Sequence, residues 1–99
     1  MTVESLTPIT EADLLEKVKN AINLKGNDFQ DDAISVWIGV VKFDLLGAGV
    51  AADVVESTLA VGCIATGVDD RWANHRDAYS GLFFEGVERL RNVVVKGAE

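Results

Sequence analysis

Apolar residues recur at helical spacing in the first third of the chain. Thr10 is a suitable N-cap residue, and the apolar positions that follow it to about Ile22 fall on one face of a helix. The opposite face is polar and carries Glu16, Lys17, Lys19 and Asn20. Gly26 then interrupts the pattern. The sequence therefore predicts an amphipathic helix over residues 10–22.

The second helical segment is apolar on two sides. It is expected to begin at Asp31 or Asp32, with Asp31 as its cap, to reach Leu46 and to end at Gly47. One stripe has helical spacing and consists of Ile34, Trp37, Ile38, Val41 and Leu45. Nearly opposite lies a second stripe, formed by Val36, Val40 and Phe43. A helix that is apolar on both sides is buried on both sides, so this helix is either the central core helix or is shared between the core and a subunit interface.

Two further helices are predicted in the second half of the chain. A short helical turn over 51–55 precedes Ser57, which can cap a helix that runs to about Trp72. The interior of that helix is small and includes Gly62 and Gly67, so either another backbone approaches it closely or it packs as a thin helix within its own chain. Ser80 can cap a last helix to residue 91, in which Phe83, Val87 and Leu90 share a face and Phe84 points away from it.

These elements indicate an all-α fold, a small bundle of four main helices in one domain over residues 1–99. Residues 1–9 are expected to form an extended N-terminal arm outside the fold, 10–91 the helical core, and 92–99 a C-terminal tail. The β-branched run Val93, Val94 and Val95 favours an extended tail. Because such a tail is rarely ordered unless something holds it, we expect it to contact another chain. The alternative is that the last helix simply continues through Val94.

The bulk composition narrows the class of protein. The chain has 99 residues, 48% of them hydrophobic, which suits one globular domain. Its net charge of −7 argues against ordinary nucleic-acid binding, which needs Lys and Arg to neutralise phosphates. Residues 1–70 carry 4 basic and 12 acidic side chains, whereas residues 71–99 carry 5 basic and 4 acidic ones. This asymmetry suits head-to-tail association of identical subunits, although chance variation in a solvated surface would give it too.

Candidate chemistry is sparse, and we expect no enzyme activity, no cofactor and no metal site. His75 is the one histidine and lies in a predicted loop, and Cys63 lies mid-helix among apolar residues without a nearby base. The adjacent Asp69 and Asp70 point about 100° apart on a helix, which disfavours a shared ion. The single cysteine cannot form an internal disulfide, and the polar N-terminus lacks the features of a signal peptide, so a cytosolic setting is expected. Uninterrupted apolar runs are too short for a membrane span.

Three segments together resemble a known family. They are LLEKVKNAINLKGNDFQDDAI, GAGVAADVVESTLAVGCIATGVDDRW and YSGLFFEGVERL, in that order between Leu14 and Leu90. Their order and spacing resemble the head–tail connector, or adaptor, proteins of tailed bacteriophages, which are small helical proteins. The chain departs from the family pattern at one point: the aliphatic residue usual between Asp and Trp is Arg71 here. That arginine is expected to pair with a carboxylate of a neighbouring subunit.

The resemblance implies a structural role in the virion neck, after assembly in the host cytoplasm. The protein would form a homo-oligomeric ring, expected to be twelvefold, between the portal and a head-closure (stopper) or tail-completion protein. Genomic DNA would pass through its channel without sequence-specific binding, and the C-terminal segment would dock on the portal. The alternative is a small cytoplasmic helical regulator or binding module that acts as a homodimer through the second helix.

The residues expected at an interface follow from these patterns. Basic side chains of the C-terminal part are expected to meet the acidic part of an adjacent subunit or partner, so that assembly weakens with added salt. The candidate interface residues are Val36, Val40, Phe43, Arg71, Arg76, Phe84, Arg89, Arg91, Val93, Val94, Val95 and Lys96.

Overall fold

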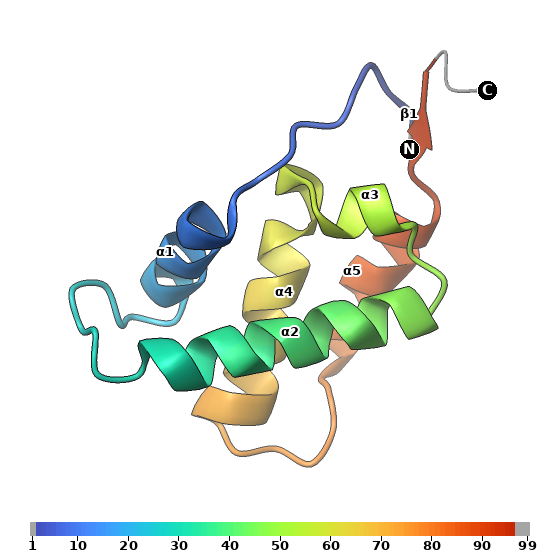
Figure 1. Cartoon of the computed structure of the whole chain (residues 1–99). Helices are drawn as coiled ribbons and strands as arrows, with labels where there is room; N and C mark the ends of the chain where they lie inside the picture. Colours follow the sequence, from blue (N-terminus) through green and yellow to red (C-terminus); the bar gives the residue numbers. More distant parts are fainter. Residues whose placement is uncertain (1, 97–99) are drawn as a thin grey trace.

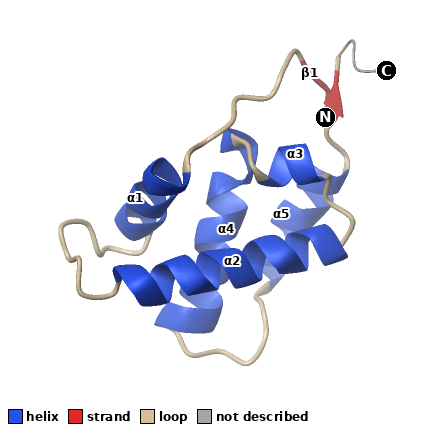
Figure 2. Cartoon of the chain, viewed as in Figure 1, coloured by secondary structure: helices blue, strands red, loops and turns tan. Residues whose placement is uncertain are grey.

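Helices make up most of the computed structural model, which describes residues 2–96 (Figures 1 and 2). The predicted all-α bundle of four main helices is confirmed. The helices are α1 (Glu11–Ala21), α2 (Asp31–Gly47), the short α3 (Ala52–Val55), α4 (Val61–Val68) and α5 (Gly81–Arg91). A 3-10 turn, η1 (Thr58–Ala60), leads into α4, and a π-helical turn, η2 (Asp69–Ala73), continues it. The short turn predicted before Ser57 is α3, so the four predicted main helices correspond to α1, α2, α4 and α5.

Side-chain caps define where three of the helical segments begin. The hydroxyl of Thr10 accepts a hydrogen bond from the backbone N–H of Asp13 at 3.1 Å, and Ser57 does the same for Leu59 at 3.2 Å. The Ser80 hydroxyl accepts from the N–H of Phe83 at 3.4 Å. Each hydroxyl satisfies a donor that the first helical turn leaves without a partner. The predicted starts of these helices are therefore confirmed.

The helix α2 begins at Asp31 and ends at Gly47, as predicted, but its cap differs from the prediction. Its N-cap is Gln30, which makes no side-chain capping bond, and Asp31 is the first helical residue. The carboxylate of Asp31 forms an ion pair with Lys19 of α1 instead. The expectation that Asp31 caps the helix was wrong, because its side chain is directed to a neighbouring helix rather than to its own first turn.

The hydrophobic core forms around α4, against which α1, α2 and α5 pack (Figure 1). The predicted core stripe of α2 supplies four buried residues, whereas Trp37 of that stripe is only partly buried. Gly67 explains how closely the helices meet: a Cβ added there would lie 2.9 Å from the side chains of both Val41 and Phe83. At Gly67 the small interior of this helix therefore allows close packing within the same chain, which was one of the two predicted explanations. Gly62, in contrast, faces open space.

The N-terminal residues are extended, but they lie against the helical body rather than outside the fold. The backbone N–H of Ile9 donates to the carbonyl of Glu56 at 3.0 Å, and that of Thr58 donates to the carbonyl of Thr7 at 2.9 Å. Leu6 and Ile9 are partly buried against the core. The expectation of a free arm over residues 1–9 is corrected for the described residues 2–9, because their backbone groups and apolar side chains find partners in the same chain.

The C-terminal tail leaves the helix after Arg91 and becomes extended, as the valine run predicted. Its strand β2 (Val94–Val95) pairs in parallel with β1 (Thr2–Val3), so the first and the last described segments lie side by side (Figure 2). The N–H of Lys96 adds a 2.7 Å hydrogen bond to the carbonyl of Val3. The alternative of a helix running through Val94 is excluded. Within the single chain, β1 holds the tail, so its order does not require another chain, and the predicted contact with another chain stays a prediction. Residues 97–99 of the predicted tail and residue 1 of the predicted arm lie outside the described residues.

Candidate subunit interface

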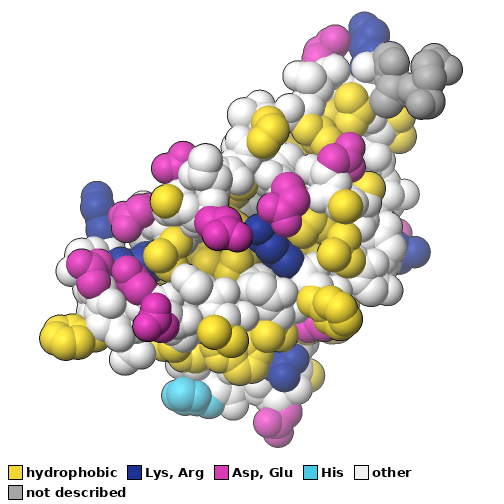
Figure 3. Space-filling model, in the orientation of Figure 1, with side chains coloured by type: hydrophobic (Ala, Val, Ile, Leu, Met, Phe, Trp, Pro, Cys, Tyr) yellow, Lys and Arg dark blue, Asp and Glu magenta, His cyan; other side chains and the backbone are white. Residues whose placement is uncertain are grey.

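The second stripe of α2 is exposed to solvent. Val36 is 65% exposed, Val40 36% and Phe43 74%, although all three lie on a helix whose other face packs into the core. Hydrophobic side chains run along the part of the surface where α2 lies (Figures 1 and 3). The described residues cover Val40 in part and leave Val36 and Phe43 mostly exposed. The prediction that the stripe is at least partly buried by something other than the first helix requires another chain at Val36 and Phe43, and there it stays a prediction.

Two more features extend this apolar surface. Leu46, also exposed, follows Phe43 by three residues on α2. From α5, the exposed ring of Phe84 meets the ring of Tyr79 edge to face, with 6.3 Å between the ring centroids. The Tyr79 hydroxyl in turn donates a hydrogen bond to the carboxylate of Asp44, the residue after Phe43. Tyr79 thus links Asp44 of α2 to Phe84 of α5.

Arg71 has partners within its own chain. Its guanidinium lies over the rings of Trp37 and Tyr79, 5.5 Å and 5.1 Å from their centroids. Its Nε also donates to the backbone carbonyl of Arg76 at 3.2 Å. Two aromatic rings of the same chain therefore receive the Arg71 guanidinium. The predicted contact of Arg71 with a neighbouring subunit stays a prediction.

The remaining candidate cations differ in whether they form ion pairs within the chain. Arg91 pairs with Glu88 on its own helix at 3.2 Å, and Lys96 pairs with Glu4 at 3.4 Å. Arg76 and Arg89 are exposed and form no ion pair with any described residue. In the tail, Val93 packs partly against the core and Val94 is exposed. Of the four arginines, Arg76 and Arg89 are thus the ones whose charges are available to a partner.

A groove of about 310 Å³ separates the exposed sides of α4 and α5. Its floor includes Gly62, Thr66 and Gly86, and Leu82 and Arg89 lie on the α5 side. Gly86 is needed for the close approach of the two helices, because a Cβ added there would lie 3.0 Å from the sulfur of Cys63. Small residues therefore leave a shallow, mainly apolar surface between the helices. The sequence showed the small residues but not that an open groove results.

Cys63 lies at this groove but is buried. Its thiol donates a weak hydrogen bond to the carbonyl of Phe83 at 3.7 Å. Burial raises the pKa of the Cys63 thiol to about 11, against a smaller lowering by Arg89. The thiol is therefore protonated at neutral pH, which is the state of a packing residue rather than of a nucleophile.

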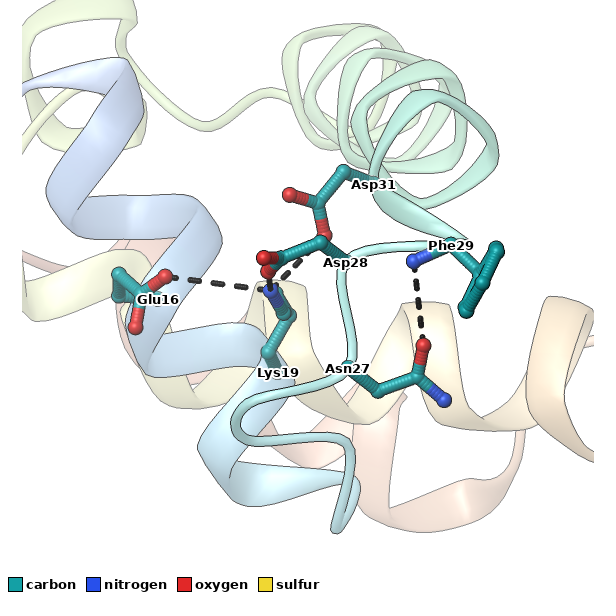
Figure 4. A network of polar contacts seen from close by, with 6 residues as sticks. All are labelled: Glu16, Lys19, Asn27, Asp28, Phe29 and Asp31. Atoms are coloured by element: carbon teal, nitrogen blue, oxygen red, sulfur yellow. Dashed lines mark hydrogen bonds and ion pairs between the residues drawn. The ribbon is translucent and has the colours of Figure 1, made fainter.

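Lys19 is a buried cation that the sequence pattern placed on the solvent face of the first helix. Its side chain is only 1% exposed and points from α1 into the loop before α2 (Figure 4). The ammonium forms 2.8 Å ion pairs with both Asp28 and Asp31, and Glu16 lies 3.9 Å away. The hydrogen bonds to Asp28 and then Asp31 raise the pKa of Lys19 above its ordinary value. The role of the cluster is therefore structural, because its ion pairs join α1, the loop and α2.

The acidic residues near η2 also have structural roles. The carboxylate of the buried Asp70 accepts a hydrogen bond from the backbone N–H of Ser80 at 2.9 Å, which holds the loop before α5. The loop residue His75 is exposed and has a positive φ of 52°. Among residues 2–96, no three His, Cys, Asp or Glu side chains gather in a way that could hold a metal ion. Within the same part of the chain, no helix has the length and apolar character to cross a membrane.

The described surface has three features that bear on the predicted subunit interface. It has an apolar stripe on α2, a small-residue groove between α4 and α5, and unpaired arginines on the second half of the chain. Comparison of the chain with known protein families, curated proteins and solved structures gave no match. A proposal about function therefore depends on the geometry of these surfaces and on the resemblance in residue order.

Proposed function

We propose that this protein is a structural component of the neck of a tailed bacteriophage, a head–tail connector that assembles as a ring between the portal and the next neck protein. The observation that carries the proposal is the exposed stripe of Val36, Val40 and Phe43 on a helix whose opposite face is core. Apolar side chains grouped on one surface of a small soluble domain are characteristic of protein contact sites. The order and spacing of residues between Leu14 and Leu90 resemble the connector family and supply the kind of partner.

The charge of the chain agrees with a channel protein. A net charge of −7 repels DNA phosphates, so a ring of such subunits would let the genome pass without holding it. In this proposal the ring is twelvefold, binds no cofactor and extends the channel of the portal toward a head-closure or tail-completion protein.

The size of the chain makes assembly energetically important. A stable protein interface covers about 800 Å² on each partner, and a ring subunit contributes two such faces. Together these would take roughly a quarter of the 6043 Å² that the single chain exposes. A domain this small gains only modest stability from its own core. Assembly should therefore raise the thermal midpoint, and the midpoint should increase with protein concentration.

The test is the oligomeric state of the purified protein, by light scattering and native mass spectrometry, alone and with the portal protein encoded in the same genome. A closed ring, or assembly that requires the portal, is the expected result. Phe43→Asp should abolish assembly while leaving the monomer folded, because Phe43 is exposed in the single chain. Phe29→Asp is the matched control: Phe29 is 98% exposed but lies in the loop before α2, away from the stripe.

The contrary outcome is a plain dimer that ignores the portal. That result would favour the second candidate, a small cytoplasmic helical regulator or binding module that dimerises through α2. The same exposed stripe supports this candidate, since it would also serve a symmetric contact between two copies. Normal assembly of Phe43→Asp would remove the stripe from both proposals.

The tail is proposed as the segment that docks on the portal. In the single chain it is held by β1, and the exposed Val94 side chain and the free edges of this two-stranded pair are available to a partner strand. Deletion of residues 92–99 should leave a folded protein that no longer attaches to the portal. A truncated protein that binds the portal with full affinity would contradict this role.

Charge is proposed to set the register of assembly. Exposed ion pairs contribute about 0–1 kcal/mol each, so they orient subunits more than they hold them. Ring formation measured between low and high ionic strength should weaken as salt is added. A ring of equal stability at both extremes would count against any role for the asymmetric charges.

A further inference from the structure

We propose that the contact between neighbouring copies is heterologous: the α2 stripe of one copy lies in the α4–α5 groove of the next, with Asp32 of the first facing Arg89 of the second. This inference rests on the self-assembly proposed above. The occupant of the groove is a second copy of this chain.

The groove has the shape that a helix needs. Helices pack at short distance only where small residues let one ridge of side chains enter, and Gly62, Thr66 and Gly86 provide such a floor. At Gly62 no atom lies within 4 Å of an added Cβ, so this part of the groove is open. The glycine costs about 1 kcal/mol of helix propensity relative to alanine, and packing within the chain gives no reason for it. An entering side chain from another copy gives that reason.

The lengths of the two surfaces agree. The stripe from Val36 to Phe43 covers seven residues of helix, which is about 10.5 Å at 1.5 Å per residue. On the α5 side, the groove runs from Leu82 to Arg89, which is also seven residues and about 10.5 Å. Two turns of one helix therefore face two turns of the other.

The charges at the ends of these surfaces are complementary and unused. Asp32 precedes Val36 by four residues and so lies on the same face of α2. It is exposed and forms no ion pair with the described residues, and the same holds for Arg89 at the groove. Pairing Asp32 with Arg89 would orient α2 antiparallel to α5, with Phe43 toward Leu82.

The stripe and the groove belong to different parts of the surface. The stripe lies on α2, opposite the face that packs on α4, whereas the groove lies between α4 and α5, which α2 crosses in Figure 1. One copy can therefore use both surfaces at once, each with a different neighbour. Such a contact continues from copy to copy and closes into a ring when the rotation between neighbours allows it.

The test uses two variants that each lack one surface. Phe43→Asp removes the stripe and keeps the groove, and Gly62→Trp fills the groove and keeps the stripe. Both should be folded by circular dichroism, because Phe43 is exposed and Gly62 faces open space. Each variant alone should be monomeric in light scattering, and an equimolar mixture should form a heterodimer and nothing larger.

A symmetric contact through α2 alone predicts a different pattern. Gly62→Trp would then self-associate as the wild type does, and mixing it with Phe43→Asp would give no heterodimer. Either of these two results would overturn the proposal, as would a wild-type chain that is monomeric at every concentration tested.

Charge reversal tests the register without altering the apolar surfaces. Asp32→Arg and Arg89→Asp should each weaken association roughly tenfold, and the double variant should recover most of the loss. Lys17→Asp is the matched control, because Lys17 is an exposed cation on α1 that lies outside the groove and forms no ion pair with the described residues. Equal effects of Lys17→Asp and Arg89→Asp, or no recovery in the double variant, would refute the pairing.

The outcomes separate this inference from the proposed function. Rings that bind the portal but tolerate Gly62→Trp would overturn the groove contact and leave the connector role intact. Heterodimers from the two half-blocked variants, together with no ring and no effect of the portal, would support the contact and overturn the connector role.

Discussion

Two glycines of α4 should respond in opposite ways to the same substitution. A Cβ at Gly67 would lie 2.9 Å from both Val41 and Phe83, whose side chains are buried in the core and would have to shift. A Cβ at Gly62 meets nothing within 4 Å. Alanine at position 67 therefore overfills the core, while alanine at position 62 only improves the helix.

The magnitudes follow from two opposing terms. Overpacking a well-packed core costs about 1–3 kcal/mol. Replacing glycine with alanine inside a helix stabilises it by about 1 kcal/mol. We therefore expect Gly67→Ala to lose about 1 kcal/mol of unfolding free energy and Gly62→Ala to gain about 1 kcal/mol. For a domain of this size, each kcal/mol shifts the thermal midpoint by about 4–8 °C.

Thermal melts followed by circular dichroism measure both shifts. They should be made in the Phe43→Asp background, so that changes in assembly at Gly62 do not enter the midpoint. The expected order of midpoints is Gly62→Ala above the parent and Gly67→Ala below it. Equal shifts of the two variants, or a gain at both positions, would refute the packing of α4 against Val41 and Phe83 that the structure gives.

Three further predictions concern titratable side chains. Lys19→Met should lower the denaturant midpoint, whereas Lys17→Met, on the exposed face of α1, should leave the midpoint unchanged. The pKa of Lys19 is raised in the folded state, so the stability that its ion pairs give to the fold is complete below the ordinary lysine pKa. That stability is lost only as the solution becomes strongly alkaline. Tyr79 is the one tyrosine, so absorbance titration reports it alone: burial and then the hydrogen bond to Asp44 raise its pKa, and ionisation should begin only well above the usual value of about 10. Cys63, with a pKa of about 11, should react with a disulfide reagent far more slowly in the native than in the unfolded chain. Equal rates in both states would contradict its burial. The contribution of the buried thiol to the free energy of unfolding should fall as pH rises toward 11.

Local sequence signals predicted most of the helical framework. Thr10, Ser57 and Ser80 stand where helices begin, because a hydroxyl at that position replaces a missing backbone partner. The four residues of the α2 core stripe that are buried follow from helical spacing alone. Caps and periodicity act over one or two helical turns, so the sequence contains all the information that they need.

Features that depend on distant residues could not be predicted in the same way. Lys19 lies on the polar face by periodicity, yet Asp28 and Asp31 bring it into the interior, and only the path of the loop decides that. The pairing of β1 with β2 joins two residues at each end of the chain, and strands this short have no periodicity to detect. The same holds for the α4–α5 groove, because the small residues are visible in the sequence but their open side is not.

The two stripes of α2 show where sequence reasoning reaches its limit and what the structure adds. Periodicity treats both stripes alike, whereas the fold buries one and leaves Val36 and Phe43 mostly exposed. A single exposed residue such as Phe29 needs no explanation, because much of any protein surface is apolar. Three residues repeated at helical spacing on one face are different, since a helix that served only its own core would have polar residues there. The regular spacing is therefore the reason for proposing that another helical face contacts this surface, and the groove floored by Gly62 is the described surface of matching length.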